Sequence, residues 1–236
     1  MVRKRPLNSK EGQAQDVVEI LDSKCLAVGE MKAKVDLTKY IEEHYFQFDN
    51  VFEHDQDNKQ IYEQCVLPLV VETFKGAKTT CFAYGQTGSG KTFTMMGPTD
   101  GSHPGLYLLA AYDVIDLLNS YTDLELNVSF FEIYCGKLQD LLNNREVVHC
   151  REDHKQQVNI VNLTEKRCHT VEDIMNALSK GMLLRAQGTT GANAESSRSH
   201  AILTMSLMHY GKLYSKMSFI DLAGSERGAD TMHTDK

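Results

Sequence analysis

The chain has 236 residues, of which 42% are apolar and 24% are charged, and its formal net charge is −7. This composition is that of a globular protein with one large domain or two small ones. The acidic balance argues against nucleic acid or an anionic membrane as a partner. No stretch approaches the roughly 20 consecutive apolar residues of a membrane-spanning helix. The basic segment Met1–Pro6 precedes no apolar run, which excludes a secretory signal there.

The six cysteines are scattered along the chain and form no Cys-x-x-Cys pair. This spacing argues against a disulfide framework and against a zinc site. We therefore expect reduced thiols and a cytoplasmic protein.

Strand-like and helix-like segments alternate in the first half of the chain. Residues Asn58–Lys75 have apolar side chains at helical spacing, with a kink expected at Pro68. Thr79–Tyr84 is a short apolar run typical of a buried strand, and a helix should begin at Lys91. The alternation predicts one α/β domain with a mixed or mostly parallel sheet.

The second half continues the same alternation. Leu124–Tyr134 reads as a long strand, and Thr170–Arg185 as an amphipathic helix that begins with Thr170 as its N-cap. Ala201–Tyr210 and Leu213–Leu222 read as two strands joined near Gly211. The second of these strands carries Asp221 at its end.

A glycine-rich loop between the predicted strand and helix fits the pattern G-x-x-x-x-G-K-[ST] in full. Its residues are Gly85, Gln86, Thr87, Gly88, Ser89, Gly90, Lys91 and Thr92. Glycines let backbone N–H groups turn toward phosphates, where a Cβ would obstruct the approach. Lys91 would reach the β- and γ-phosphates, and the Thr92 hydroxyl would bind Mg²⁺. The loop predicts ATP binding.

Asp221 ends an apolar strand downstream of this loop, the position of an acidic residue that holds Mg²⁺. Alone, such an aspartate is more often a strand-end cap. Gly224 follows it, where a bare backbone could approach the γ-phosphate. The pair gains weight only from the loop upstream.

The segment Asn193–His200 is polar and rich in hydroxyl groups. A solvated loop and a switch that senses the γ-phosphate explain its chemistry equally well. In the second reading its serines bind metal and phosphate, and Arg198 forms an ion pair with Glu226.

Three motifs together, Gly85–Thr92, Asn193–His200 and Asp221–Glu226, resemble the P-loop, switch I and switch II of the kinesin motor family. Arg3-Lys4-Arg5-Pro6 resembles the family's motif on the adenine side. The resemblance implies a P-loop NTPase fold with a central mixed sheet flanked by helices on both faces. It also implies that residues 1–236 are a motor domain, roughly its first two-thirds.

The resemblance also implies roles for single residues. Arg3, Arg5, Pro6, Tyr62 and Phe93 would surround the adenine, with Phe93 in place of a histidine found in many kinesins. Ser197 would join Thr92 and Asp221 around Mg²⁺, while Asn193, Ser196 and Gly224 would sense the γ-phosphate. Arg198 and Glu226 would close the site, and water would attack the γ-phosphate in line. Glu195 replaces a more usual histidine, with little consequence expected.

A further segment, Met31–Tyr40, resembles the extended loop of the kinesin-13 class, whose signature is Lys34-Val35-Asp36. Alone, such a tripeptide would more often be an ordinary solvated loop. Other segments also resemble that class: Cys81–Tyr84, Glu152–Val158 and Arg227–Thr231. Ser225 departs from it, since many members carry asparagine there. The resemblance implies a protein that removes tubulin from microtubule ends.

Because tubulin is acidic, its contacts on this acidic chain should be local basic patches. The hypothesis places them at Lys34, Val35 and Asp36, with Lys32 and Lys39 nearby, and at Arg151 and Lys155. The expected location is the microtubule cytoskeleton, including the spindle, and a homodimer is compatible with the sequence. Two alternatives remain open: a kinesin that walks along microtubules, and a tubulin-binding module that binds nucleotide without turnover.

Overall fold

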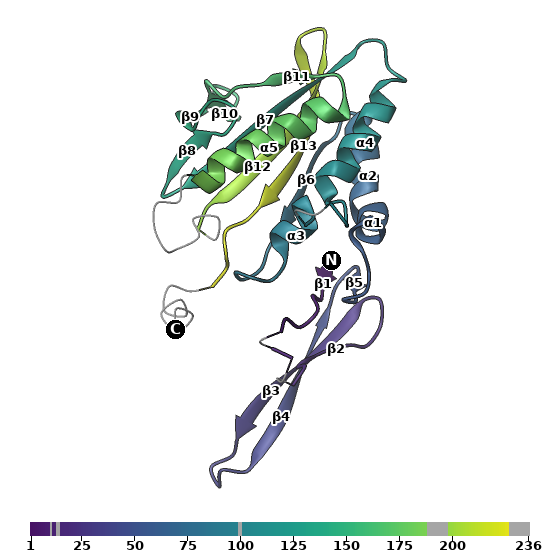
Figure 1. The fold of residues 1–236 in the computed structure, drawn as a ribbon, viewed down its shortest axis with the longest axis vertical. Helices are drawn as coiled ribbons and strands as arrows, with labels where there is room; N and C mark the ends of the chain where they lie inside the picture. The colour runs from purple at the N-terminus through teal and green to yellow at the C-terminus, as the bar shows by residue number, and fades with distance from the viewer. Residues whose placement is uncertain (10, 13–14, 99–100, 188–197, 227–236) are drawn as a thin grey trace. The chain divides into compact units, whose positions relative to one another are not determined.

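The computed structural model describes residues 1–9, 11–12, 15–98, 101–187 and 198–226. The chain divides into two compact units, Met1–Ile61 and Tyr62–Lys236, and each is described by itself (Figure 1). None of the described helices combines the length and apolar character needed to cross a membrane.

The first unit is built from short strands. Strand β1 (Val2–Arg3) pairs in parallel with β5 (Val51–Phe52). Strands β2 (Val18–Ile20), β3 (Cys25–Ala33) and β4 (Lys39–Gln47) form an antiparallel sheet, and helix α1 (Asn58–Ile61) ends the unit. Leu26 and Phe52 are among its few buried apolar residues.

The segment Met31–Tyr40, expected as a loop, is the distal part of the β3–β4 hairpin. Its flanks belong to the two strands, and residues 34–38 form the tip. Two backbone hydrogen bonds close that tip: Lys34 N–H donates to Thr38 O, and Leu37 N–H donates to Lys34 O. Leu37 adopts a positive φ of 66° in this turn.

The second unit has an eight-stranded mixed sheet. Its order is β10-β9-β8-β7-β12-β13-β6, with β11 also paired to β7. The strands are β6 (Lys78–Ala83), β7 (Leu124–Tyr134), β8 (Lys137–Asp140), β9 (Glu146–Glu152), β10 (Val158–Val161), β11 (Lys166–Cys168), β12 (His200–His209) and β13 (Lys212–Asp221). Only the β13–β6 pair among them is parallel.

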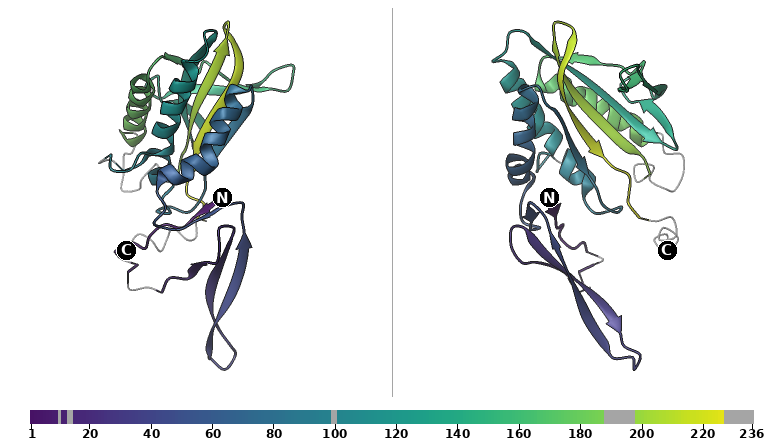
Figure 2. Two further views of the ribbon diagram at one scale, coloured as in Figure 1. Left: turned by 90° about the vertical axis from the view of Figure 1, so that its right-hand side faces the viewer. Right: turned by 180° about the vertical axis from the view of Figure 1, so that it is seen from behind.

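The helices of this unit are the π-helix η1 (Tyr62–Val66), α2 (Leu67–Phe74), α3 (Lys91–Met96), α4 (Leu106–Leu118) and α5 (Val171–Gln187). Helix α2 packs on β6 and β13, whereas α4 and α5 pack on each other and on β7 (Figure 2). Phe130 of β7 and Phe219 of β13 are fully buried in the core. The α/β architecture, with a mixed sheet flanked by helices, is confirmed.

Helix α5 fits closely against the sheet. A Cβ added at Gly181 would collide with the ring of Phe130 and would lie 3.2 Å from Leu141 Cβ. Glycine is therefore required by space, although it lowers helix propensity. At the start of the helix, Thr170 Oγ1 accepts a hydrogen bond from Asp173 N–H, which confirms the predicted cap.

The helix expected over Asn58–Lys75 is divided by a π-helical turn. The π-helix η1 comes directly before α2, and Pro68 lies at the start of α2. Proline has no N–H group to donate to a helical hydrogen bond. It is tolerated in the first turn of a helix, where N–H groups have no partner within the helix, and Pro68 lies in the first turn of α2. A kink at Pro68 was predicted, but the π-helical turn directly before it was not.

Candidate nucleotide site

The P-loop connects β6 to α3, in the context that the motif requires (Figure 1). Gly88 and Gly90 have positive φ values of 78° and 93°. A Cβ at either position would meet no atom within 4 Å, so the backbone conformation, not crowding, favours glycine there. Lys91 Nζ donates to Gly85 O at 2.8 Å and to Gln86 O at 3.0 Å. The ammonium group is thus folded back over the loop.

Asp221 lies beside this loop because of the strand register. In the parallel pair β13–β6, Asp221 is opposite Ala83, two residues before the loop begins. Thr92 Oγ1 donates to Asp221 Oδ2 at 3.1 Å. The structure therefore brings together two of the three predicted metal ligands, and the third, Ser197, lies outside the described residues.

The oxygen atoms at Asp221 and Thr92 are suitable ligands for a small divalent cation. Asp221 is only 4% exposed, and its Oδ1 atom accepts no hydrogen bond from any residue that the structure describes. A buried carboxylate oxygen without a donor is costly unless a cation approaches it. Carboxylate and hydroxyl oxygens are the ligands that Mg²⁺ prefers.

The segment after Asp221 runs along the P-loop. Leu222 N–H donates to Ala83 O at 3.3 Å, and Ser225 N–H donates to Gly85 O at 3.1 Å. Ala223 N–H donates to His200 Nδ1 at 3.0 Å, which requires that this nitrogen carry no proton. These hydrogen bonds hold the predicted switch II against the P-loop, where the γ-phosphate that it would sense is expected to bind.

Glu226 occupies the P-loop side of this segment. Its Oε2 accepts a hydrogen bond from Thr87 N–H at 2.8 Å, and its other oxygen contacts the Thr87 hydroxyl. These hydrogen bonds are the main cause that lowers the pKa of Glu226, with a smaller attraction from Lys91. A Cβ at Gly224 would collide with the Glu226 carboxylate, so only glycine permits this approach.

The predicted pair of Arg198 and Glu226 is not formed. Arg198 is exposed, and Glu226 contacts Thr87 instead. Two other predicted switch residues, Asn193 and Ser196, lie outside the part of the chain that the structure describes. The ion pair stays a prediction for another state of the site.

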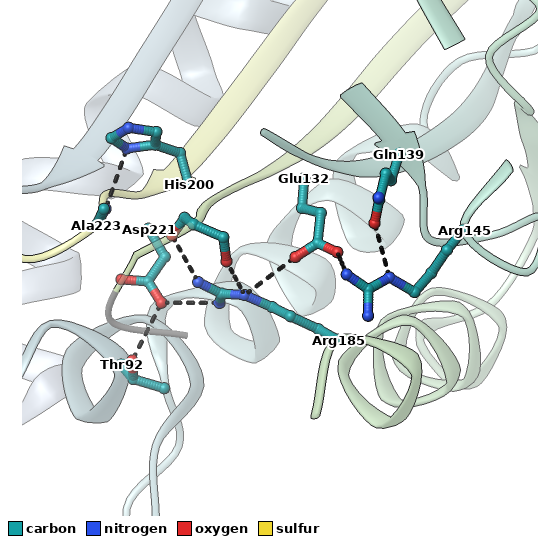
Figure 3. Close-up of polar contacts among 9 residues, drawn as sticks. Thr92, Glu132, Gln139, Arg145, Arg185, His200, Asp221 and Ala223 are labelled. Atoms are coloured by element: carbon teal, nitrogen blue, oxygen red, sulfur yellow. Dashed lines mark hydrogen bonds and ion pairs between the residues drawn. The ribbon is translucent and has the colours of Figure 1, made fainter. Parts of the chain in front are cut away.

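One residue at this site escaped the sequence analysis. Arg185, near the end of α5, is 3% exposed. It donates to Asp221 Oδ2 at 3.3 Å (Figure 3). It also donates to both the side chain and the carbonyl of Ser199. Ile174, Leu178, Gly181 and Arg185 are all buried on one stripe of the helix. An arginine at helical spacing with apolar positions was the available signal.

The adenine-side residues of the first unit are engaged with their own unit. Arg3 donates to Asn58 Oδ1 at 2.5 Å and to Gln56 O at 3.1 Å. Arg5 forms two hydrogen bonds to Glu11, at 2.6 and 2.7 Å, and one to Pro6 O at 2.9 Å. Their contact with adenine stays a prediction.

The two aromatic residues predicted near adenine differ in exposure. Tyr62 is 3% exposed, and its hydroxyl donates to Asp113 at 2.5 Å. Burial is the main cause that raises its pKa. Phe93 is 41% exposed, and its ring centroid lies 6.3 Å from that of His103. Of the two rings, only that of Phe93 has a largely accessible face.

The predicted tubulin contacts lie on two hairpins. Lys34, Val35 and Asp36 are exposed at the β3–β4 tip, whereas Arg151 lies near the end of β9 and Lys155 lies in the β9–β10 turn. Lys32, expected in the basic cluster, instead forms ion pairs with Glu30 and Glu42. Its charge is therefore largely neutralised within the hairpin.

Comparisons with known proteins agree on one family. A family model described as the kinesin motor domain matches residues 3–236. The chain is 48% identical to kinesin-like protein KIN-13B of Arabidopsis thaliana and 44% identical to kinesin-like protein KIF24 of Homo sapiens. Both alignments cover 100% of this chain, but 35% and 18% of the two relatives. The chain thus spans about a third and about a fifth of their lengths.

A solved structure shows the same fold. It is the structure of a fast kinesin, and it bears on that protein's ATPase mechanism and interactions with microtubules. The TM-score is 0.83 at 28% identity, over 99% of this chain and 67% of that one. The similarity to KIN-13B confirms the resemblance to the kinesin-13 class. The chain belongs to the kinesin motor family.

Proposed function

We propose that this chain binds ATP with Mg²⁺, hydrolyses it, and uses the cycle to remove tubulin from microtubule ends. The observation that carries the nucleotide part is the 3.1 Å hydrogen bond from Thr92 to Asp221. This hydrogen bond joins the P-loop to Asp221, the residue at the end of β13 that would bind the metal. Kinesins associate with the microtubule cytoskeleton, and a location at the spindle is the finer proposal.

The loop and its neighbours would do most of the chemistry by position and charge. Lys91, now bound to two carbonyls of the loop, would turn to the phosphates. Thr92 and Asp221 would hold Mg²⁺, with Ser197 as the predicted third ligand. When bound, Mg²⁺ would neutralise the negative charge that builds up on the phosphate oxygens.

Glu226 would act as a switch in this cycle. Because the Thr87 N–H group has one hydrogen, it cannot donate fully to both Glu226 and a phosphate oxygen. Nucleotide binding at this amide would therefore displace Glu226, leaving it available to pair with Arg198. This exchange would couple phosphate binding to closure of the site.

The mechanical part of the proposal rests on the β3–β4 hairpin. Val35 is completely exposed and Leu37 is 82% exposed at its tip, so both apolar side chains are accessible to a partner. Lys34 Nζ lies 5.9 Å from the Tyr40 ring centroid, and Asp36 accepts a hydrogen bond from Thr38 N–H. The tip thus presents a positive, an apolar and a negative side chain in a defined turn.

The first test separates the candidate functions under the microscope. Stabilised microtubules should shorten from their ends when the protein and ATP are added. Gliding without shortening would favour a walking kinesin. Binding with no phosphate release, stimulated or not by tubulin, would favour a module that does not hydrolyse ATP.

The second test targets the P-loop. Lys91→Ala should abolish ATP turnover, because it removes the cation that would reach the β- and γ-phosphates from the P-loop. The measurement is phosphate release with and without microtubules. Turnover retained in this variant would contradict the assignment of the site.

The third test targets the hairpin tip. Replacing Lys34, Val35 and Asp36 by alanine should abolish shortening and leave the ATPase rate without microtubules unchanged. Tyr210→Ala with Lys212→Ala, at the exposed tip of the β12–β13 hairpin, is the matched control and should shorten microtubules normally. Normal shortening by the triple variant would refute the role of the tip.

A further inference from the structure

A row of three buried charges and one partly buried charge extends from the metal-site aspartate into the sheet (Figure 3). Asp221, Arg185, Glu132 and Arg145 alternate in sign along this row, with side-chain exposures of 5%, 3%, 2% and 18%. They come from β13, α5, β7 and the turn between β8 and β9. Asp221 and Arg185 belong to the nucleotide site as described above, whereas Glu132 and Arg145 lie beyond it.

Arg185 is shared between the two carboxylates of the row. Its guanidinium lies 3.3 Å from Asp221 Oδ2 and 4.0 Å from Glu132 Oε2. The contact with Asp221 is the shorter, but Glu132 is close enough to attract the same cation. How strongly Arg185 holds Asp221 therefore depends on the charge of Glu132.

Arg145 controls Glu132 from the other side. Its guanidinium lies 2.6 Å from Glu132 Oε1, and its Nε donates to Gln139 Oε1 at 2.8 Å. Its backbone is fixed as well, since Arg145 N–H donates to Asp140 O at 2.8 Å in a turn with a φ of 63°. This cation is held in place independently of the nucleotide site.

We propose that Glu132 and Arg145 are positioning residues that set the affinity of the nucleotide site for its divalent cation. The inference rests on the proposed function, because it assumes that Asp221 faces Mg²⁺. Arg185 and Mg²⁺ attract the same carboxylate and repel each other. Any change that shifts Arg185 toward Asp221, or adds positive charge to the row, should weaken Mg²⁺ binding.

The two residues should act in opposite directions. Glu132→Gln removes an anion that attracts Arg185, so Arg185 should hold Asp221 more strongly and Mg²⁺ should bind more weakly. Arg145→Gln removes a cation from Glu132, whose carboxylate should then draw Arg185 away from Asp221. Mg²⁺ should bind more tightly in that variant. A merely structural role would disturb the site in the same direction in both.

The test measures retention of a fluorescent ADP analogue by the full chain as free Mg²⁺ is varied. The readout is the Mg²⁺ concentration at half-maximal retention, together with nucleotide affinity at saturating Mg²⁺. We expect this concentration to rise about threefold or more for Glu132→Gln and to fall by a similar factor for Arg145→Gln. Affinity at saturating Mg²⁺ should change little in either variant.

Two controls make the result decisive. Arg145→Lys keeps the positive charge and should leave the Mg²⁺ requirement near the unmodified value. Arg167→Gln removes an exposed arginine that pairs with Glu125, also on β7, and should have no effect. If Glu132→Gln does not fold, the comparison of Arg145→Gln with Arg145→Lys decides alone.

The outcomes separate the two levels of the proposal. Shifts of equal direction in the Glu132 and Arg145 variants, or no shift in either, would overturn the positioning role. In that case an unmodified chain that retains nucleotide only with Mg²⁺ would leave the proposed function intact. An unmodified chain that binds the analogue without any need for Mg²⁺ would overturn both.

Discussion

Replacing Arg185 by methionine should strongly destabilise the fold. Methionine keeps an apolar stem in the buried position but removes the charge between Asp221 and Glu132. Asp221 would keep the Thr92 hydroxyl as a donor, and Glu132 would keep Arg145 at 2.6 Å. The variant therefore leaves one buried carboxylate without a cation.

The expected magnitude follows from that asymmetry. Removing one partner of a buried ion pair typically costs about 3–5 kcal/mol, because the other charge stays buried and uncompensated. Since Arg145 still compensates Glu132, we expect a loss near 3 kcal/mol, the lower end of the roughly 3–5 kcal/mol range. For a chain of this size that loss corresponds to a fall in Tm of about 6–12 °C.

The assay is denaturant and thermal unfolding without nucleotide, followed by circular dichroism. Arg167→Met is the matched control: Arg167 pairs with Glu125 of β7 at 2.7 Å, but the two side chains are 53% and 43% exposed. A surface pair of this kind contributes about 0–1 kcal/mol. The two variants thus compare the loss of an arginine–carboxylate ion pair at a buried position and at an exposed one.

A double variant tests whether Arg185 stabilises the fold through its contact with Asp221. Adding Asp221→Asn to Arg185→Met removes the uncompensated charge, so the double variant should lose less stability than the sum of the two single variants. A loss below about 1 kcal/mol for Arg185→Met would show that water reaches the row. Strict additivity in the cycle would likewise refute the coupling of Arg185 to Asp221.

Two further predictions concern packing and charge elsewhere. Gly181→Ala should lower stability by up to about 2 kcal/mol in unfolding experiments, since the collision with the sheet outweighs the gain of about 1 kcal/mol in helix propensity. Lys180→Ala, exposed on the same helix, should not lower it. The hydrogen bonds from Arg5 lower the pKa of Glu11 to about 2, so this contact should persist until the pH falls to about 2. In Arg5→Gln the pKa should rise toward the ordinary glutamate value in an NMR titration, while the remaining hydrogen bond from Asn8 N–H still lowers it somewhat, and an unchanged value would rule out the contact in solution.

Elements with strong local signals were predicted from the sequence. The P-loop lies between β6 and α3, and β7, α5, β12 and β13 are long and contain buried apolar residues at regular spacing. Helix α5 also begins with a capping pair. In these segments propensity, pattern and burial favour the same structure, so a single sequence is sufficient.

The elements that were missed depend on partners far along the chain. In β4 the pattern of apolar and charged residues does not alternate cleanly, because most of its side chains are exposed. Strands β8, β10 and β11 have three or four residues each, too few for a periodic signal. Helix α4 is apolar on most of its surface, which obscured its period.

The site was predicted unevenly for the same reason. The P-loop motif is local, and Asp221 could be placed because it is the polar residue that ends an apolar, strand-like run. Arg185 could not, since its role depends on Asp221, 36 positions away, and on Ser199. The Arg198–Glu226 pair was predicted from the charges of the two segments and from the family resemblance, and it differs from the contact of Glu226 with Thr87 seen in the structure.

Asp221 is a buried residue of the fold and also a predicted metal ligand. The way its charge is compensated in the folded chain therefore affects how strongly it can bind a metal. A carboxylate buried to 4% exposure would be costly to fold if only a metal ion compensated it, as in proteins that unfold when their structural metal is removed. Arg185 and Thr92 stabilise Asp221 without the metal, so the chain can fold before it binds nucleotide. If Asp221 holds Mg²⁺ as proposed, the same arginine would compete with the cation for that carboxylate and thereby limit metal affinity. In the proposed function, a motor that exchanges its nucleotide in every cycle would need both properties, and a row of charges that balances Arg185 between two carboxylates would provide them together.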